Sequence, residues 1–296
     1  MRRRASERFP LRFTRRLVLL RGHKKGPAEN GATVRESRHV SLHVAANIAV
    51  ITVRRPSKMN AINAKMWTDL TETVREASRD ERVRALVFRG EGDNFSAGSD
   101  LKELGRSSLP RAEDIFHRME ECVATIEESP LPSVACIRGY ALGTGLLLAL
   151  ACELRVADSG AIMGMPIARL GITLTEPFVK RLVSLIGPAR TKDLVYTGRL
   201  IEAPEALRWG LVNRLVDEDR SALRDTLRVA DVITQQSSAS IRAAKRWAGS
   251  GSGRMPAMYN YVDPEDFPEG VQAFLERRQP QFDRVEKAPV RAKQSS

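Results

Sequence analysis

Cysteine and long apolar runs are both scarce in this chain of 296 residues. Its three cysteines, Cys122, Cys136 and Cys152, lie far apart and form no C-x-x-C pair. This pattern argues against a disulfide framework and fits a reducing cytosol, so we expect a cytoplasmic protein. No His, Cys and carboxylate cluster has metal-ligand spacing, so no metal site is expected. The missing G-x-G-x-x-G and G-x-S-x-G motifs disfavour a nucleotide-dependent dehydrogenase and a serine hydrolase.

The excess of positive charge lies mainly at the N-terminus. Residues 1–38 carry twelve Lys and Arg against three Glu, a net of +9 out of the formal +12 for the whole chain. The remaining body is therefore not a basic nucleic-acid-binding domain. The apolar run 17–20 is too short for a membrane span or a signal-peptide core, so neither nucleic acid nor membrane is an expected partner. We expect residues 1–37 to be a disordered extension, with a transit peptide or a polyanion-binding tail as alternatives.

The body alternates between strand and helix patterns. β-branched runs predict strands over residues 39–54, 82–88 and 131–137, and shorter ones at 154–156 and 161–163. Apolar periodicity predicts helices over 63–78 and 111–128, and a nearly all-apolar helix over 146–154. Helical patterns dominate from there to the C-terminus. This order predicts an α/β fold with much parallel pairing.

Two glycine turns each join a strand to a helix. In the first, residues 95–104, Asp100 is a candidate N-cap and Glu103 stands where a capping box needs it. The second, residues 139–145, directly precedes the apolar helix. Such turns leave backbone N–H groups unpaired at the helix start. Two turns that face one carbonyl oxygen would form an oxyanion hole, although glycine turns also occur for geometry alone.

Seven fragments occur in order across about residues 38–285 and together resemble the crotonase (enoyl-CoA hydratase/isomerase) superfamily. They are RRPSKMNAINAKM, GEGDNFSAGSDLKEL, SPLPSVACIRGYALGTG, CELRVAD, YTGRLIEAPEALRWGLVNRLV, IRAAKRW and EDFPEGVQAFLERRQPQF. The resemblance implies a spiral of ββα units over residues 38–230. It also implies a C-terminal helical region, 231–296, that packs on a neighbouring subunit in a homotrimer or dimer of trimers.

The same resemblance implies an acyl-CoA thioester as substrate, with coenzyme A part of that substrate and no separate cofactor. Backbone N–H groups of Ser99, in A-G-S-D, and Thr144, in G-T-G, would stabilise the thioester enolate. The residues matching the family's CoA contacts are Lys58 and Met59 in one loop, main-chain groups of Ala97, Ser99, Asp100 and Leu101, Lys102 toward a phosphate, and Phe274 and Arg277 from a neighbouring subunit.

The hydratase pattern of the family breaks at two positions. The resemblance implies that hydratases of the family carry G-G-G-x-E in the second turn and P-E after the next strand. This chain has Leu147 and Ile167 at the positions that match the two glutamates. Neither side chain can move a proton or orient water, so efficient hydration is not expected. Glu176 is a candidate acid/base residue. Its alternative interpretation is an ordinary first-turn acid of a helix capped by Thr175.

Two functions remain open. The first is a lyase or isomerase of this superfamily, in fatty acid metabolism, whose dry pocket beside Leu147 and Ile167 suits a step without added water. The second is a non-catalytic relative that binds acyl-CoA or acts as an oligomer partner.

Overall fold

The computed structural model describes residues 34–173, 175–217, 221–248 and 261–282. Within these ranges a larger sheet has the strand order β1-β2-β3-β4-β5-β7-β10, and a smaller sheet has the order β6-β8-β9. The strands are β1 (Val34–Glu36), β2 (Val40–Ala45), β3 (Ile48–Val53), β4 (Ala85–Gly90), β5 (Ser133–Ile137), β6 (Tyr140–Leu142), β7 (Leu154–Asp158), β8 (Ile162–Gly164), β9 (Leu200–Glu202) and β10 (Arg214–Val216). From β3 to β10 the larger sheet is parallel, which confirms the predicted α/β class.

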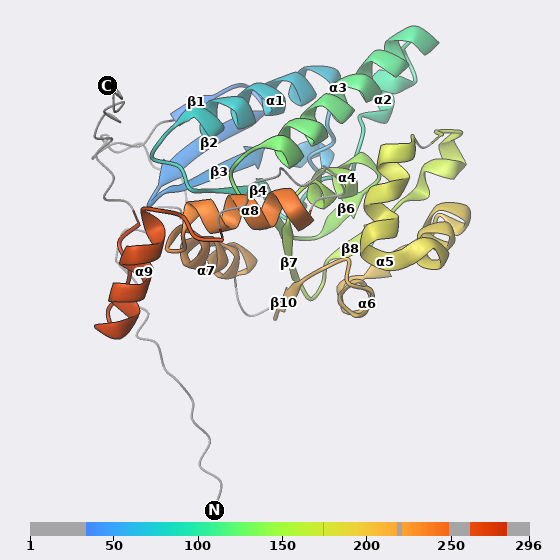
Figure 1. Ribbon diagram of the computed structural model, residues 1–296. Coiled ribbons are helices and arrows are strands. Elements are labelled where there is room, and N and C mark those ends of the chain that lie inside the picture. Colours follow the sequence, from blue (N-terminus) through green and yellow to red (C-terminus); the bar gives the residue numbers. More distant parts are fainter. Residues whose placement is uncertain (1–33, 174, 218–220, 249–260, 283–296) are drawn as a thin grey trace, which may run out of the picture.

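Helices cover both faces of the larger sheet (Figure 1). α1 (Ala64–Arg79) and α3 (Leu109–Glu128) lie on one face, and α7 (Ala222–Thr234) lies on the other. The remaining helices are α2 (Leu101–Leu104), α4 (Thr144–Leu150), α5 (Glu176–Thr197, broken at Gly187), α6 (Ala203–Trp209), α8 (Ser238–Ala248) and α9 (Asp266–Leu275), with 3-10 turns η2 (Pro56–Lys58) and η3 (Pro166–Leu170). No helix in the described ranges is both long and apolar enough to cross a bilayer.

The central strands sort their side chains between two apolar layers. In β4, Leu86 and Phe88 join the main core, whereas Ala85 and Val87 pack in the layer that contains Leu227 of α7. This alternation follows from the two-residue period of a strand. Because both layers are apolar, β4 is buried on both faces, as expected of a central parallel strand.

Arg155 ties the start of β7 to the segment that leads into β10. Its side chain is 2% exposed. Its Nε donates to Leu211 O at 2.7 Å, and its Nη1 donates to Cys152 O at 2.6 Å. Burial lowers the pKa of this guanidinium. The two carbonyl oxygens therefore offset the cost of burying the guanidinium, and the guanidinium in turn satisfies these two buried acceptors.

Lys245 holds α8 against the body of its own chain. Its Nζ donates to Ile126 O at 3.1 Å and to Leu131 O at 2.8 Å, and it pairs with Glu153 at 3.0 Å. Beyond α8, α9 extends to the margin of the molecule and exposes Phe274 by 82% (Figure 1). Packing of this region on a neighbouring subunit stays a prediction.

Two predicted domain limits differ from the structure. β1 begins at Val34, inside the segment predicted to be disordered through residue 37, because residues 34–36 pair antiparallel with β2. Residues 1–33 of that extension lie outside the described residues. The predicted limit at residue 230 falls within α7, which continues to Thr234 and packs on the sheet as one helix.

Besides β1, three other short strands were not predicted. β6 occupies part of the stretch predicted as a glycine turn, and β9 and β10 lie in the region where helical patterns were expected to dominate. Each has three residues and gains its hydrogen bonds from distant partners: β6 and β9 from β8, and β10 from β7. A run of three residues is too short for a period to identify it.

Candidate active site

The two glycine turns lie side by side and are joined by backbone hydrogen bonds. The first follows β4 and the second follows β5, so both lie at the carboxyl ends of neighbouring parallel strands. Ser96 N donates to Tyr140 O at 2.9 Å, and Leu142 N donates to Ser96 O at 3.0 Å. The unpredicted strand β6 thereby aligns the two turns.

Glycine is required where the turns touch. Gly98 has a φ of +96°, and a Cβ there would stand 2.6 Å from Leu142 O and 3.4 Å from Thr144 N. A Cβ on Gly145 would stand 2.5 Å from Ser96 O. Any side chain at either position would push the turns apart, because both close neighbours are backbone oxygens.

The backbone N–H groups of Ser99 and Thr144 border this contact. Neither donates a hydrogen bond within the described part of the chain, whereas the N–H groups of Ala97, Gly98 and Asp100 all do. Ser99 is half-buried and Thr144 is 5% exposed. Buried backbone donors are nearly always satisfied in a folded protein. The two donors left over on these joined turns are therefore candidates for contact with a ligand.

The loop that carries Lys58 and Met59 runs beside the first turn. Ala97 N donates to Met59 O at 2.9 Å, and Ile62 N donates to Gly98 O at 2.8 Å. Met59 has a left-handed backbone and is 47% exposed. The structure thus brings the predicted CoA-binding loop next to Ala97 and Ser99.

Asn60, which was not singled out from the sequence, secures that loop. It is fully buried. Its Oδ1 accepts from Arg55 N at 2.8 Å, and its Nδ2 donates to Glu91 O at 2.9 Å and Asn94 O at 2.6 Å. Its φ is +56°, a conformation that asparagine tolerates better than most residues. An asparagine between a predicted strand and a predicted helix was the available signal, but the two carbonyls that its Nδ2 contacts are more than thirty residues away.

Asp100 caps α2 as predicted, but Glu103 does not complete a capping box. The Asp100 carboxylate accepts from Lys102 N and Glu103 N at 3.0 and 3.3 Å. Glu103 instead accepts from Ala64 N at 3.0 Å, at the start of α1. The prediction was wrong because α1 offers an unpaired helix-start N–H, which a local pattern cannot reveal. The backbone groups of Asp100 are hydrogen-bonded within the chain: its N–H donates to Ile62 O, and its carbonyl accepts from Leu104 N.

Asp100 forms an ion pair with Arg55, whose Nη1 lies 2.6 Å from Oδ2. Burial alone would raise the pKa of Asp100, but the hydrogen bond from Arg55 and the two capping bonds hold it below its ordinary value. A depressed folded pKa gives stability that is present above the unfolded pKa, about 3.9, and is lost as pH falls through the folded one.

We therefore expect Asp100→Asn to lower the free energy of unfolding by about 1–3 kcal/mol at pH 7 and by a smaller amount at about pH 3, where the carboxyl of the unfolded chain is mostly protonated. Urea unfolding at both pH values measures this difference. Asp114→Asn is the matched control, because Asp114 pairs with Arg118 and Arg111 on an exposed surface and should change stability little. If the loss of unfolding free energy in Asp100→Asn were the same at both pH values, the charge of the Asp100 carboxylate would not be its cause.

Leu147 and Ile167 form an apolar border to the second turn. Leu147 is 0% exposed and Ile167 is 5% exposed. Both approach Gly143: Leu147 N donates to Gly143 O at 3.0 Å, and Ile167 Cγ2 lies 3.9 Å from an ideal Cβ built there. Both residues predicted to line the pocket are therefore buried in the main core close to the second turn, and neither side chain is titratable.

Glu176 is in solvent at the first turn of α5. Its side chain is 75% exposed and its Oε1 lies 2.7 Å from Lys180 Nζ. The hydrogen bond from Lys180 lowers the pKa of Glu176. Thr175 occupies the N-cap position, but its side chain makes no capping bond. Glu176 is therefore an exposed acidic residue in the first turn of α5, as in the alternative interpretation.

The remaining predicted contacts divide between two parts of the molecule. Leu101 is 56% exposed, and Lys102 beside it is also exposed, on α2 next to the first turn. Phe274 and Arg277 lie on and just after α9, on the far side of the molecule from α2 (Figure 1). Within one chain the structure therefore does not bring these last two residues to the site.

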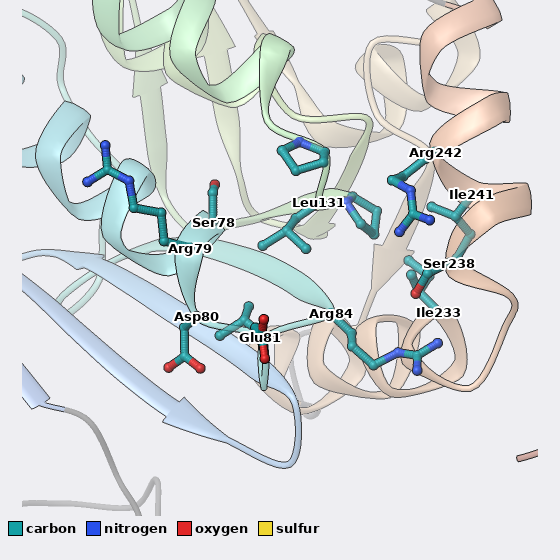
Figure 2. A pocket seen from close by; sticks show the side chains of 13 residues that line it. Ser78, Arg79, Asp80, Glu81, Arg84, Leu131, Ile233, Ser238, Ile241 and Arg242 are labelled. Carbon is teal, nitrogen blue, oxygen red and sulfur yellow. The ribbon is translucent and has the colours of Figure 1, made fainter. Parts of the chain in front are cut away.

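A charged cavity lies at the opposite edge of the sheet (Figure 2). Arg79, Arg84 and Arg242 line it together with Asp80 and Glu81. Its walls include residues that precede β4 and β5, whereas Ser99 and Thr144 follow the carboxyl ends of those strands. The cavity is thus separate from the candidate active site.

The cysteines do not take part in the site. All three are buried and free, and burial raises the pKa of Cys122 and Cys152 to about 12. They are therefore thiols rather than thiolates at neutral pH. Among the described residues, no group of three or more His, Cys, Asp or Glu could hold a metal ion.

Comparison with known proteins defines the class. The family model described as enoyl-CoA hydratase/isomerase matches residues 43–285. The "Probable enoyl-CoA hydratase" of Bacillus subtilis is 33% identical over 255 residues, 82% of this chain and 98% of that protein. The "Crotonyl-CoA hydratase" of Syntrophomonas wolfei is 32% identical over 254 residues, 82% of this chain and 97% of that protein.

A solved structure agrees with these matches. The crystal structure of an enoyl-CoA hydratase/carnithine racemase from Magnetospirillum magneticum has a TM-score of 0.78 at 28% identity, and the match covers 83% of this chain and 96% of that one. The chain therefore belongs to the enoyl-CoA hydratase/isomerase family, the crotonase superfamily. The resemblance drawn from the sequence fragments is confirmed, as is the crotonase-like fold.

Proposed function

We propose that this protein is an acyl-CoA enzyme that stabilises a thioester enolate with the N–H groups of Ser99 and Thr144, and that it is not an efficient hydratase. The observation that carries the proposal is the pair of unbonded donors on two turns held together by Gly98 and Gly145. An enolate oxygen between them would receive two hydrogen bonds. Each such donor typically contributes a factor of about 10²–10³ in rate.

The apolar border argues for a reaction without added water. The relatives are named as hydratases, and hydration requires groups that activate water and deliver a proton to the α-carbon. Leu147 and Ile167 stand at the positions that we match to the family's two glutamates. A dry border preserves the strength of the two N–H bonds to a charged oxygen. Decarboxylation, which generates the enolate without a base, suits this site better than hydration, and proton transfer at the α-carbon would need an acid/base residue from outside this border.

The proposed CoA site follows the first turn and its neighbouring loop. Lys58, Met59 and Lys102 would contact the CoA moiety, with main-chain groups of Ala97, Asp100 and Leu101. Coenzyme A is part of the substrate in this proposal, and no separate cofactor is needed. Phe274 and Arg277 would reach the nucleotide end only from a second subunit, in a homotrimer or a dimer of trimers.

Consumption of crotonyl-CoA by the purified protein, followed as loss of the conjugated thioester absorbance, tests the proposal. We expect the CoA thioester to bind but hydration to fall below about 1 per second, the lower end of ordinary enzymatic rates. The S. wolfei relative named as a crotonyl-CoA hydratase is the matched positive control.

Three outcomes separate the possibilities. Hydration at an ordinary enzymatic rate would contradict our interpretation of Leu147 and Ile167, and the effect of Glu176→Ala would then be measured first. Failure to bind any CoA thioester would contradict the whole proposal. Binding without hydration would support it, and turnover of branched, aromatic or β-carboxylated thioesters would then distinguish an enzyme from a binding protein.

A further inference from the structure

The side chains of Ser99 and Thr144 are hydrogen-bonded to each other across the two turns. Ser99 Oγ lies 3.1 Å from Thr144 Oγ1. Within the described residues the N–H groups of the same two residues donate to no acceptor, so the hydroxyl pair belongs to the residues that carry these two donors. Thr144 is buried and Ser99 is half-buried, which keeps the pair largely out of bulk water.

The hydroxyl pair has one proton more than its mutual hydrogen bond uses. Each hydroxyl carries one proton and can also accept, and its hydrogen rotates to suit its partner. One hydroxyl donates to the other, and the accepting hydroxyl keeps its own proton. Within the described residues neither oxygen has a second protein partner. One O–H is therefore available to donate to a ligand oxygen bound by the two N–H groups.

We propose that the Ser99–Thr144 hydroxyl pair gives the remaining O–H to the oxygen held by the two N–H groups, so that the hole has three donors. This inference rests on the proposed function, because it assigns a further role at the same site. A hydrogen bond to a charged acceptor is stronger than one to a neutral acceptor. The third donor therefore favours the enolate over the neutral thioester, at a site whose apolar border, Leu147 and Ile167, provides no carboxyl group.

An equilibrium measurement can test the third donor without any catalytic base. Acetoacetyl-CoA has an acidic C–H between two carbonyls, and its enolate absorbs differently from its neutral form. The apparent pKa of the bound ligand, followed by absorbance against pH with the full chain in excess, reports how well the hole stabilises the enolate. Affinity for butyryl-CoA, a neutral thioester, is measured in parallel.

We expect the double variant Ser99→Ala/Thr144→Val, which retains both backbone N–H groups, to raise the apparent pKa of bound acetoacetyl-CoA. Loss of one hydrogen bond to a charged group corresponds to about a 10- to 100-fold shift, or one to two pH units. Butyryl-CoA affinity should change less than threefold. Thr144→Ser, which keeps the hydroxyl, should retain the wild-type value.

The matched control is Ser107→Ala/Thr125→Val, because both hydroxyls donate only to carbonyls four residues earlier in the chain, at 2.9 and 2.7 Å. It should leave both measurements unchanged. An unchanged ligand pKa in the Ser99/Thr144 double variant overturns the inference. So does an equal loss of affinity for both thioesters, which would mean that the pair only maintains the shape of the site. Failure of the wild-type protein to bind either thioester would instead overturn the proposed function.

Discussion

Replacing Gly98 with alanine is expected to lower the free energy of unfolding by about 2–4 kcal/mol and to abolish acyl-CoA binding. Two costs combine. The positive φ of +96° is strained for any residue with a Cβ, at about 1–2 kcal/mol, and the new atom would stand 2.6 Å from Leu142 O. Because the obstacle is a backbone oxygen, relief must come from separating the two turns. Urea unfolding and titration with butyryl-CoA measure the two effects.

Gly92→Ala is the matched control for the first of these costs. Gly92 has a similar positive φ of +74°, but a Cβ there would meet only Pro56 Cβ at 3.4 Å. This variant should lose about 1–2 kcal/mol of stability and keep its affinity for butyryl-CoA. Equal binding by the Gly98→Ala protein and the wild type would show that the approach of the two turns is not needed for the ligand.

Arg155→Met is expected to destabilise the protein by about 2–4 kcal/mol without any direct effect on ligand contacts. The change leaves the carbonyls of Cys152 and Leu211 without their buried donor, and each unsatisfied buried acceptor costs about 1–3 kcal/mol. Methionine fills much of the same volume, which limits the cavity contribution. The midpoint of urea unfolding is the measurement.

Two further variants isolate the cause. Arg214→Met makes the same chemical change at an exposed position of β10 and should cost less than about 0.5 kcal/mol. Arg155→Lys keeps the positive charge but lacks the two guanidinium N–H groups that reach both carbonyls. We therefore expect it to recover only part of the stability that Arg155→Met loses. Full recovery with lysine would show that charge alone, rather than the two directed bonds, stabilises this region.

Local patterns predicted the features that depend on neighbouring residues. The helix at α1, the strand at β4 and the Asp100 cap are each specified within a few residues, and each agrees with the structure. The two glycine turns could be located for the same reason. Their role as donors for an oxyanion was a prediction from the family resemblance, and it remains a proposal.

Features that depend on distant partners could not be predicted. Strand β6 exists through its pairing with β8, more than twenty residues later. Glu103 accepts from Ala64 N, 39 positions earlier, and therefore does not cap the start of its own helix. The Ser99–Thr144 hydroxyl bond spans 45 positions. No window of ten residues contains both partners of any of these contacts.

The burial of the three cysteines makes the protein suitable for site-specific labelling. Cys122, Cys136 and Cys152 are each at most 5% exposed, and burial raises the pKa of all three. Maleimides react with accessible thiolates, so the folded native chain offers them almost none. A cysteine introduced in place of exposed Lys102, beside the first turn, would be the single reactive thiol. A fluorophore attached there could report thioester binding without removal of any natural cysteine.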